Sequence, residues 1–224
     1  LFPRLAREAA DKVFTTGYLS FVLHSHLPFV RHPERDYFLE ENWLFEAITE
    51  TYLPLLEMFD RLLADQVLTR VTVSLSPTLV AMLRDPHLRE KYGRHLNKLC
   101  ELGRHEVDRT RNDTTFGPIA KFYLDHFERL RSLFHDQYHG DIVGEFARLE
   151  ENGFLEVMTC ASTHGFLPLL AVQPEMVRAQ INVAVEEHER HFGRRPRGIW
   201  LPECAYVEGL DEMLAEANLD YFFV

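Results

Sequence analysis

The order of apolar and polar positions predicts short buried strands that alternate with amphipathic helices. Apolar runs of strand length lie at 18–23, 71–75, 154–159, 198–201 and 221–224. Most of these runs are apolar without alternation, which is typical of strands buried on both faces of a parallel sheet. Apolar residues at helical spacing fill the intervals, so the pattern predicts an α/β fold built from right-handed βαβ crossovers.

The intervals also carry signals for where helices begin, break and end. Ser76-Pro77 predicts a helix start, with the serine hydroxyl as N-cap and proline at the first helical position. Pro54 falls inside a long helical pattern and predicts a kink or a division, because proline lacks the backbone donor. Gly193 predicts the end of a later helix. Residues 87–150 are charged, amphipathic and mostly helical, so we expect a helical insertion between strands two and three.

The two ends of the sequence suggest a part of a longer protein. Residues 1–16 are expected to form an N-terminal helix or arm, and residues 17–224 to form the main domain. The first residue is leucine rather than methionine, and the last apolar run stops at Val224 without a polar exit.

Composition excludes several classes of partner. The chain has 224 residues and a formal net charge of −11. Such an acidic surface repels nucleic-acid phosphates and anionic membranes, so neither is an expected partner. Cys100, Cys160 and Cys204 are too few and too scattered for a disulfide framework, which favours a cytoplasmic location. The sequence contains no phosphate loop, nucleotide fingerprint or CxxC pair, and no cofactor or metal is expected.

Histidines gather where strands of the predicted sheet end. His24 and His26 are two residues apart and therefore share one face of an extended backbone. Such a pair binds a polar ligand or a metal, and the metal is the second choice because no carboxylate lies nearby on that strand. The alternative is structural: one of the two is a core histidine whose hydrogen bonds are satisfied within the protein. His164 precedes Gly165, which lets the backbone approach a ligand, and a ligand contact is expected there.

Glu203 directly follows an apolar strand and is the candidate catalytic carboxylate. We expect it to lose some hydration and to be held by its rigid strand. The alternative is an ion pair with an arginine such as Arg197. Trp200 and Tyr206 flank it, and either stacks on sugar rings or packs in the core. Cys204 has no basic partner in sequence and is interpreted as a packing residue.

Ordered segments of the chain resemble the glycoside hydrolase family 57 α-glucan branching enzymes. The resemblance rests on the segments VLHSHLPFVR (22–31), CASTHGFLP (160–168) and GIWLPECAY (198–206), with support from ETYLPLL (50–56) and LSP (75–77). It covers nearly the whole chain from Gly17 onward.

This resemblance implies a fold, a reaction and roles for particular residues. It implies a (β/α)7 barrel, TIM-barrel-like and incomplete here, and a retaining mechanism on α-1,4-glucan such as amylose or glycogen, with α-1,6 branches as the product. Glu203 falls on the family's nucleophile, and His24 and His164 fall on histidines that line the donor subsite. The family's acid/base aspartate follows the last barrel strand, so the sequence ends before it.

Other functions fit the same residues. An α-amylase or a 4-α-glucanotransferase of the same family differs only in the acceptor. A metal-dependent hydrolase would use His24 and His26 as ligands. A glucan-binding fragment without catalysis belongs to another class.

Overall fold

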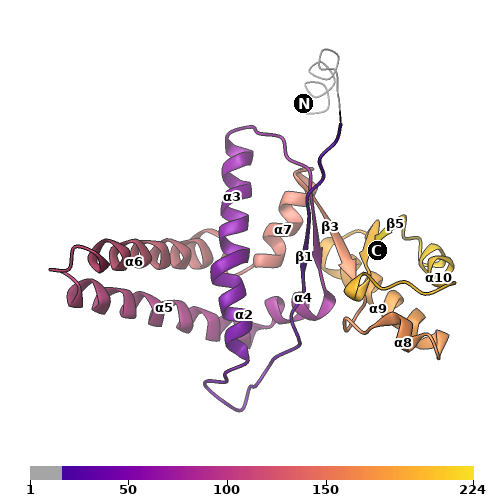
Figure 1. The fold of residues 1–224 in the computed structure, drawn as a ribbon, viewed down its shortest axis with the longest axis horizontal. Helices are drawn as coiled ribbons and strands as arrows, with labels where there is room; N and C mark the ends of the chain where they lie inside the picture. Colours follow the sequence, from indigo (N-terminus) through magenta and orange to yellow (C-terminus); the bar gives the residue numbers. More distant parts are fainter. Residues whose placement is uncertain (1–16) are drawn as a thin grey trace.

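The computed structural model describes residues 17–224, and the arm expected at 1–16 lies outside them (Figure 1). Its sheet has 5 parallel strands in sequence order. They are β1 (Val22–Ser25), β2 (Val71–Leu75), β3 (Leu155–Cys160), β4 (Gly198–Trp200) and β5 (Tyr221–Phe223). Parallel neighbours in sequence order are the arrangement of a β/α barrel. The predicted α/β class is confirmed, and the strands form part of such a barrel.

The first strand lies further along the chain than the apolar run predicts. β1 begins at Val22, while Tyr18 and Leu19 are 98% and 81% exposed. Within β1, Leu23 is 37% exposed and Val22 is only partly buried, so its apolar residues are not covered on both faces. The expectation of burial on both faces is therefore wrong for this strand. The shift places His24 inside the strand instead of after it.

Helices α2 (Glu41–Ala47) and α3 (Leu53–Ala64) form one continuous rod (Figure 1). Between them lies a π-helical turn, η1 (Ile48–Tyr52), in which the Leu53 amide bonds to the Ile48 carbonyl. Pro54 sits in the first turn of α3 and has no N–H to return to the preceding turn. The division predicted at Pro54 is thus a change of hydrogen-bonding pattern rather than a change of direction.

The segment between β2 and β3 is helical, as predicted. It contains α4 (Pro77–Arg84), α5 (Pro86–Arg109), α6 (Phe116–Ser132), η2 (Leu133–Gln137) and α7 (Ile142–Glu151). Figure 1 shows α5 and α6 as a hairpin that extends away from the sheet, whereas α7 packs on β3. The Ser76 hydroxyl accepts the Leu79 amide at 3.3 Å, which confirms the predicted N-cap of α4.

The last third of the chain completes the sheet and its cover. It adds α8 (Leu167–Leu170), α9 (Pro174–Phe192), the 3-10 turn η3 (Pro202–Cys204) and α10 (Leu210–Glu216). Gly193 ends α9 at a φ of 70°, the left-handed cap that the sequence predicts. One buried cluster joins β2 to helices α2 to α7, and a second joins β4 to α8, α9 and α10. In the described part of the chain, no helix has both the length and the hydrophobicity to cross a membrane.

Candidate active site

The first two strands present paired polar side chains on one face. His24 lies opposite Ser74 in the register of β1 and β2, and its Nδ1 is 3.1 Å from the Ser74 hydroxyl. Two residues on, His26 Nδ1 is 3.4 Å from the Ser76 hydroxyl. Because side chains alternate along a strand, both pairs point to the same side of the sheet. The hydroxyls therefore orient both imidazoles from the neighbouring strand.

Four rings from the ends of three strands, β1, β3 and β4, form what we call the histidine stack, made of His24, His26, His164 and Trp200. The His26 and His164 ring centroids are 3.6 Å apart, with planes inclined by 10°. The His24 ring lies 4.4 Å from Trp200, also at 10°. The sequence-predicted residues of β1, of the loop after β3 and of β4 thus meet at one place.

Glu203 stands beside this stack on a strained turn. Its backbone has φ 57° and ψ 23°, and Cys204 and His164 also have positive φ values, of 53° and 56°. The left-handed region costs a side chain-bearing residue about 1–2 kcal/mol, and such strain tends to gather at functional sites. His164 Nε2 is 3.5 Å from a Glu203 carboxylate oxygen. The turn after β4 therefore aims the carboxylate at the His164 ring.

The surroundings of Glu203 differ from the expectation in one respect. Its side chain is 74% exposed, so the expected loss of hydration does not occur among residues 17–224. The alternative ion pair with Arg197 is also wrong, because Arg197 contacts Asp220 and Glu156 instead. Among residues 17–224, Glu203 is therefore held by its backbone and by His164, and no arginine pairs with it.

The histidines of the stack are held in their neutral form. Burial, together with His164 and His26 nearby, lowers the pKa of His24 from 6.5 to about 4. Burial likewise lowers the pKa of His26 and of His164, while the Glu203 carboxylate raises both and only partly offsets it. A neutral imidazole offers one donor and one acceptor, a combination suited to hydroxyl groups.

The two aromatic candidates are placed differently. Trp200 belongs to the histidine stack and also lies 5.9 Å from the Phe223 ring. Tyr206 stacks on Phe222 at 6.0 Å, and its hydroxyl donates to Asp211 at 2.8 Å. The structure therefore brings Trp200 together with the histidines and ties Tyr206 to α10 and β5.

The geometry offers no support for a metal centre. No three His, Cys, Asp or Glu side chains within 17–224 are arranged to hold a metal ion. In the histidine stack the ring planes are nearly parallel, and the lone pairs of imidazole nitrogens lie in those planes. The lone pairs of His24, His26 and His164 consequently do not converge on one point.

Three residues that touch the histidines are not among the predicted site residues. Ser74 and Ser76 repeat the two-residue spacing of His24 and His26 on the adjacent strand, and that repetition was the available signal. In the sequence Cys160 is marked only as one of three scattered cysteines and as the first residue of the segment CASTHGFLP (160–168). Its buried Sγ lies 3.0 Å from Nδ1 of His164, a contact between the end of β3 and the loop after it.

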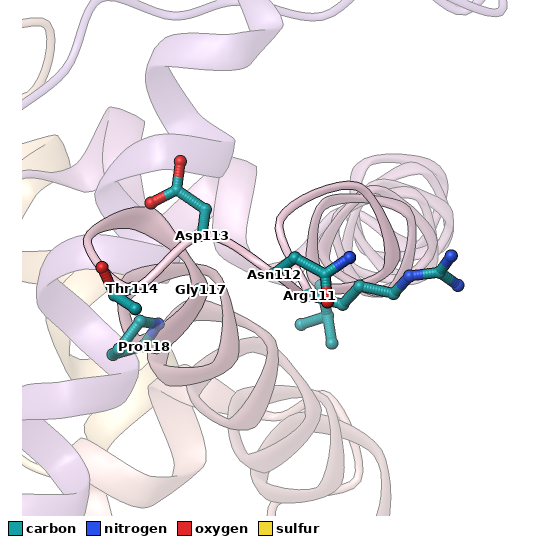
Figure 2. Close-up of a pocket in the computed structure, with 7 residues that line it drawn as sticks. Arg111, Asn112, Asp113, Thr114, Gly117 and Pro118 are labelled. Atoms are coloured by element: carbon teal, nitrogen blue, oxygen red, sulfur yellow. The ribbon is translucent and has the colours of Figure 1, made fainter.

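A hollow elsewhere in the molecule is unrelated to this cluster. It lies at the α5–α6 turn, at the far end of the hairpin, and Figure 2 shows Arg111 and Asp113 pointing away from each other there. The Asp113 carboxylate accepts the amides of Thr115 and Phe116, at 2.8 and 2.9 Å. These bonds lower the pKa of Asp113 and explain it as a turn residue that starts α6.

Known proteins are similar to this chain in sequence and in fold. The chain is 36% identical to a 1,4-alpha-glucan branching enzyme of Thermococcus kodakarensis, across 93% of this chain and 32% of the relative. The crystal structure of the alpha-amylase AmyC from Thermotoga maritima is 50% identical with a TM-score of 0.87, covering 92% of this chain and 39% of that one. A branching enzyme structure from Pyrococcus horikoshii is 32% identical with a TM-score of 0.85, covering 92% and 41%.

A sequence model of one protein family matches nearly the whole chain and not only its separate motifs. The chain spans only 32% to 41% of the length of the curated relatives it matches. Within the chain, the sequence model described as glycosyl hydrolase family 57 matches residues 20–224, which contain every strand of the sheet. The chain therefore belongs to glycosyl hydrolase family 57.

Proposed function

We propose that this chain forms the donor side of the active site in a 1,4-alpha-glucan branching enzyme. The observation that carries the proposal is the placement of Glu203, on a strained turn at the end of β4 and beside neutral His164. The 36% identity to a branching enzyme supplies the choice of reaction. The substrate is an α-1,4-glucan such as amylose or glycogen.

A reaction that retains the configuration of the anomeric carbon requires a nucleophile and an acid/base group. One oxygen of Glu203 attacks the anomeric carbon of the donor glucose, and the glycosidic bond to the rest of the chain breaks. The leaving oxygen takes a proton from a second carboxyl group about 5–5.5 Å from the first. That group is the aspartate that family resemblance places after the last strand, outside this sequence. The 6-hydroxyl of a second glucan then displaces Glu203 and returns the proton.

The histidine stack suits the charge that develops during this reaction. The transition state resembles an oxocarbenium ion, so positive charge builds up on the sugar ring. Because burial keeps the pKa of His24 near 4, its ring is neutral at pH 7 and does not repel that charge. His24 and His26 hydrogen-bond the hydroxyls of the donor sugar, and Trp200 or Tyr206 stacks on a sugar face. His164 lines the same subsite, with its two ring nitrogens facing Cys160 and Glu203.

The same site supports a second candidate function, an α-amylase, because the AmyC structure is 50% identical over 92% of this chain. The two reactions share the glycosyl-enzyme and differ in the acceptor, which is water in hydrolysis. We infer a cytoplasmic role in glycogen synthesis from the branching reaction and from the three free cysteines, which suit a reducing compartment.

The experiment incubates the complete enzyme with amylose and counts α-1,6 linkages by proton NMR alongside new reducing ends. Branching predicts α-1,6 linkages in excess of reducing ends, whereas an amylase gives reducing ends alone. Glu203→Gln should lower the rates at which α-1,6 linkages and reducing ends form by about a thousandfold or more. Glu208→Gln, an exposed control on the same loop, should keep full activity. If the unaltered enzyme binds amylose but forms neither product, the catalytic proposal is wrong and a glucan-binding role replaces it.

A further inference from the structure

The contact between Cys160 and His164 lies beside the proposed nucleophile and has no part in the mechanism proposed above. The thiol of Cys160 lies at the end of β3, fully buried, with Sγ 3.0 Å from Nδ1 of His164. The opposite nitrogen of the same ring, Nε2, is 3.5 Å from the Glu203 carboxylate. A single imidazole thus bridges a buried thiol and the proposed nucleophile.

We propose that Cys160 is a positioning residue, whose S–H bond to Nδ1 holds neutral His164 in the tautomer that carries its proton on Nε2 and directs that N–H at Glu203. The proposal rests on the proposed function, because it assigns a role relative to the nucleophile.

Both ends of the ring favour this tautomer. Burial raises the pKa of the Cys160 thiol to about 12, so the sulfur keeps its proton and is available as a donor. A donor at Nδ1 requires that this nitrogen be unprotonated, which leaves the proton of the neutral ring on Nε2. The opposite tautomer would set the Nε2 lone pair against a carboxylate oxygen, which is repulsive. Thiol and carboxylate therefore select the same state.

Other contacts of His164 fix the ring without choosing between its nitrogens. His26 stacks on the face of the ring at 3.6 Å, and the side chain is 8% exposed. Stacking restrains the ring plane equally for either tautomer. Among residues 17–224, the contact specific to Nδ1 is the one with Cys160. Removing the thiol should therefore change which nitrogen carries the proton while leaving the position of the ring unchanged.

The tautomer matters because of what it does to the nucleophile. An N–H directed at one oxygen of Glu203 orients the carboxylate and leaves the other oxygen for the anomeric carbon. The contact at 3.5 Å is longer than an ordinary hydrogen bond, and catalytic contacts of this kind tighten when substrate binds. With the proton on Nδ1 instead, the carboxylate would lose this donor, so the attack would slow while sugar binding changed little.

Nitrogen-15 NMR of the histidines tests the tautomer directly, because it separates protonated from unprotonated ring nitrogens. The complete enzyme is labelled at histidine, and the His164 signals are assigned by their loss in His164→Gln. We expect Nε2 to be protonated in the unaltered enzyme and the Nδ1-protonated form to grow in Cys160→Ala. A wild-type spectrum with the proton on Nδ1 overturns the proposal, whatever the variants do.

Kinetics provide the second readout. Cys160→Ala should lower kcat about tenfold with KM nearly unchanged, as loss of one hydrogen bond predicts. Cys160→Ser keeps a donor and should recover most of that loss. Cys100→Ala is the matched control, since Cys100 is equally buried but lies in α5. If kcat and the His164 spectrum are the same in Cys160→Ala as in Cys100→Ala, the proposal is wrong.

These outcomes are separable from a failure of the proposed function. Should Glu203→Gln keep full activity, the assignment of the nucleophile is wrong, and the inference falls with it even if Nε2 is protonated. Should Glu203→Gln be inactive while Cys160→Ala and the control agree, the function stands and only the role of Cys160 is lost. If Cys160→Ala does not fold, the wild-type spectrum and Cys160→Ser still decide.

Discussion

The imidazole of His26 lies flat on that of His164, with ring centroids 3.6 Å apart and planes inclined by 10°. One ring follows β1 and the other follows β3, so the parallel sheet brings together residues far apart in sequence. Two stacked imidazolium ions would repel each other at this distance, and burial adds to the cost of charging either ring. The contact therefore belongs to neutral histidines, in agreement with their lowered pKa values.

The first prediction concerns pH. The pKa of His24 is about 4 in the folded chain and 6.5 ordinarily, so the unfolded chain takes up the proton first as pH falls. The stability that depends on neutral His24 is complete above about pH 6.5 and is lost progressively down to about pH 4. We expect the urea midpoint of the complete enzyme to fall across this window, and to fall less steeply in His24→Gln.

A matched histidine provides the control for this measurement. His105 is exposed on α5, and His105→Gln should show the same pH dependence as the unaltered enzyme. Because His24 is partly exposed to solvent, the slope should stay below the limit of about 1.4 kcal/mol per pH unit for one proton. Identical slopes in all three proteins would show that His24 is not held neutral by the fold.

The second prediction concerns a buried ion pair beside the loop that follows the histidines. Lys91 Nζ donates to both Glu41 oxygens, at 3.0 and 2.7 Å, and to the His32 carbonyl at 2.9 Å. Both side chains are at most 2% exposed. Lys91→Met leaves the Glu41 carboxylate buried without its cation, which should cost about 3–5 kcal/mol of unfolding free energy in chemical denaturation.

Two further variants show whether burial of the charge is the cause. Lys91→Met combined with Glu41→Gln removes both charges and keeps an acceptor for the His32 amide, so much of the loss should return. Arg94→Met breaks the exposed pair with Glu90 on the same helix and should cost less than about 1 kcal/mol. Equal losses in Lys91→Met and Arg94→Met would contradict this account.

The fold was predictable where a local signal and the sheet agree. Residues 71–75 form β2 as the apolar run predicts, and Gly193 ends α9 as its backbone freedom predicts. The first strand was misplaced, because the run at 18–23 reports hydrophobicity and not the presence of a neighbour. Exposure of Tyr18 depends on which strands flank β1, and no local pattern contains that information.

The sequence predicted which residues come together better than it predicted the contacts among them. Strand-end position predicted that His24, His164 and Glu203 lie close together, because parallel strands end at one edge, and the structure brings them together. The exposure of Glu203 and the link from Cys160 to His164 depend on backbone geometry after the strands end. A cysteine four residues before a histidine does not predict a contact between the two side chains unless the conformation of the intervening turn is known.

The third prediction tests the packing of β4 against β5. Gly198 lies opposite Tyr221, and a Cβ at this position would overlap the tyrosine ring. The ring is fixed by its hydroxyl, which donates to Glu156 at 2.9 Å. Gly198→Ala should therefore cost about 1–3 kcal/mol of unfolding free energy. In a double-mutant cycle, Gly198→Ala with Tyr221→Leu should lose less than the sum of the single losses. Additive losses would mean that the ring is not the obstacle.

The most direct test of the account asks which side chain becomes bonded to the sugar. The complete enzyme is incubated with a fluorinated α-glucosyl donor that slows release of the glycosyl-enzyme, then digested, and the labelled peptide is sequenced by mass spectrometry. We expect one sugar adduct, attached to Glu203 and lost in Glu203→Gln. An adduct on any other side chain, or a trapped label that persists in Glu203→Gln, would contradict this expectation.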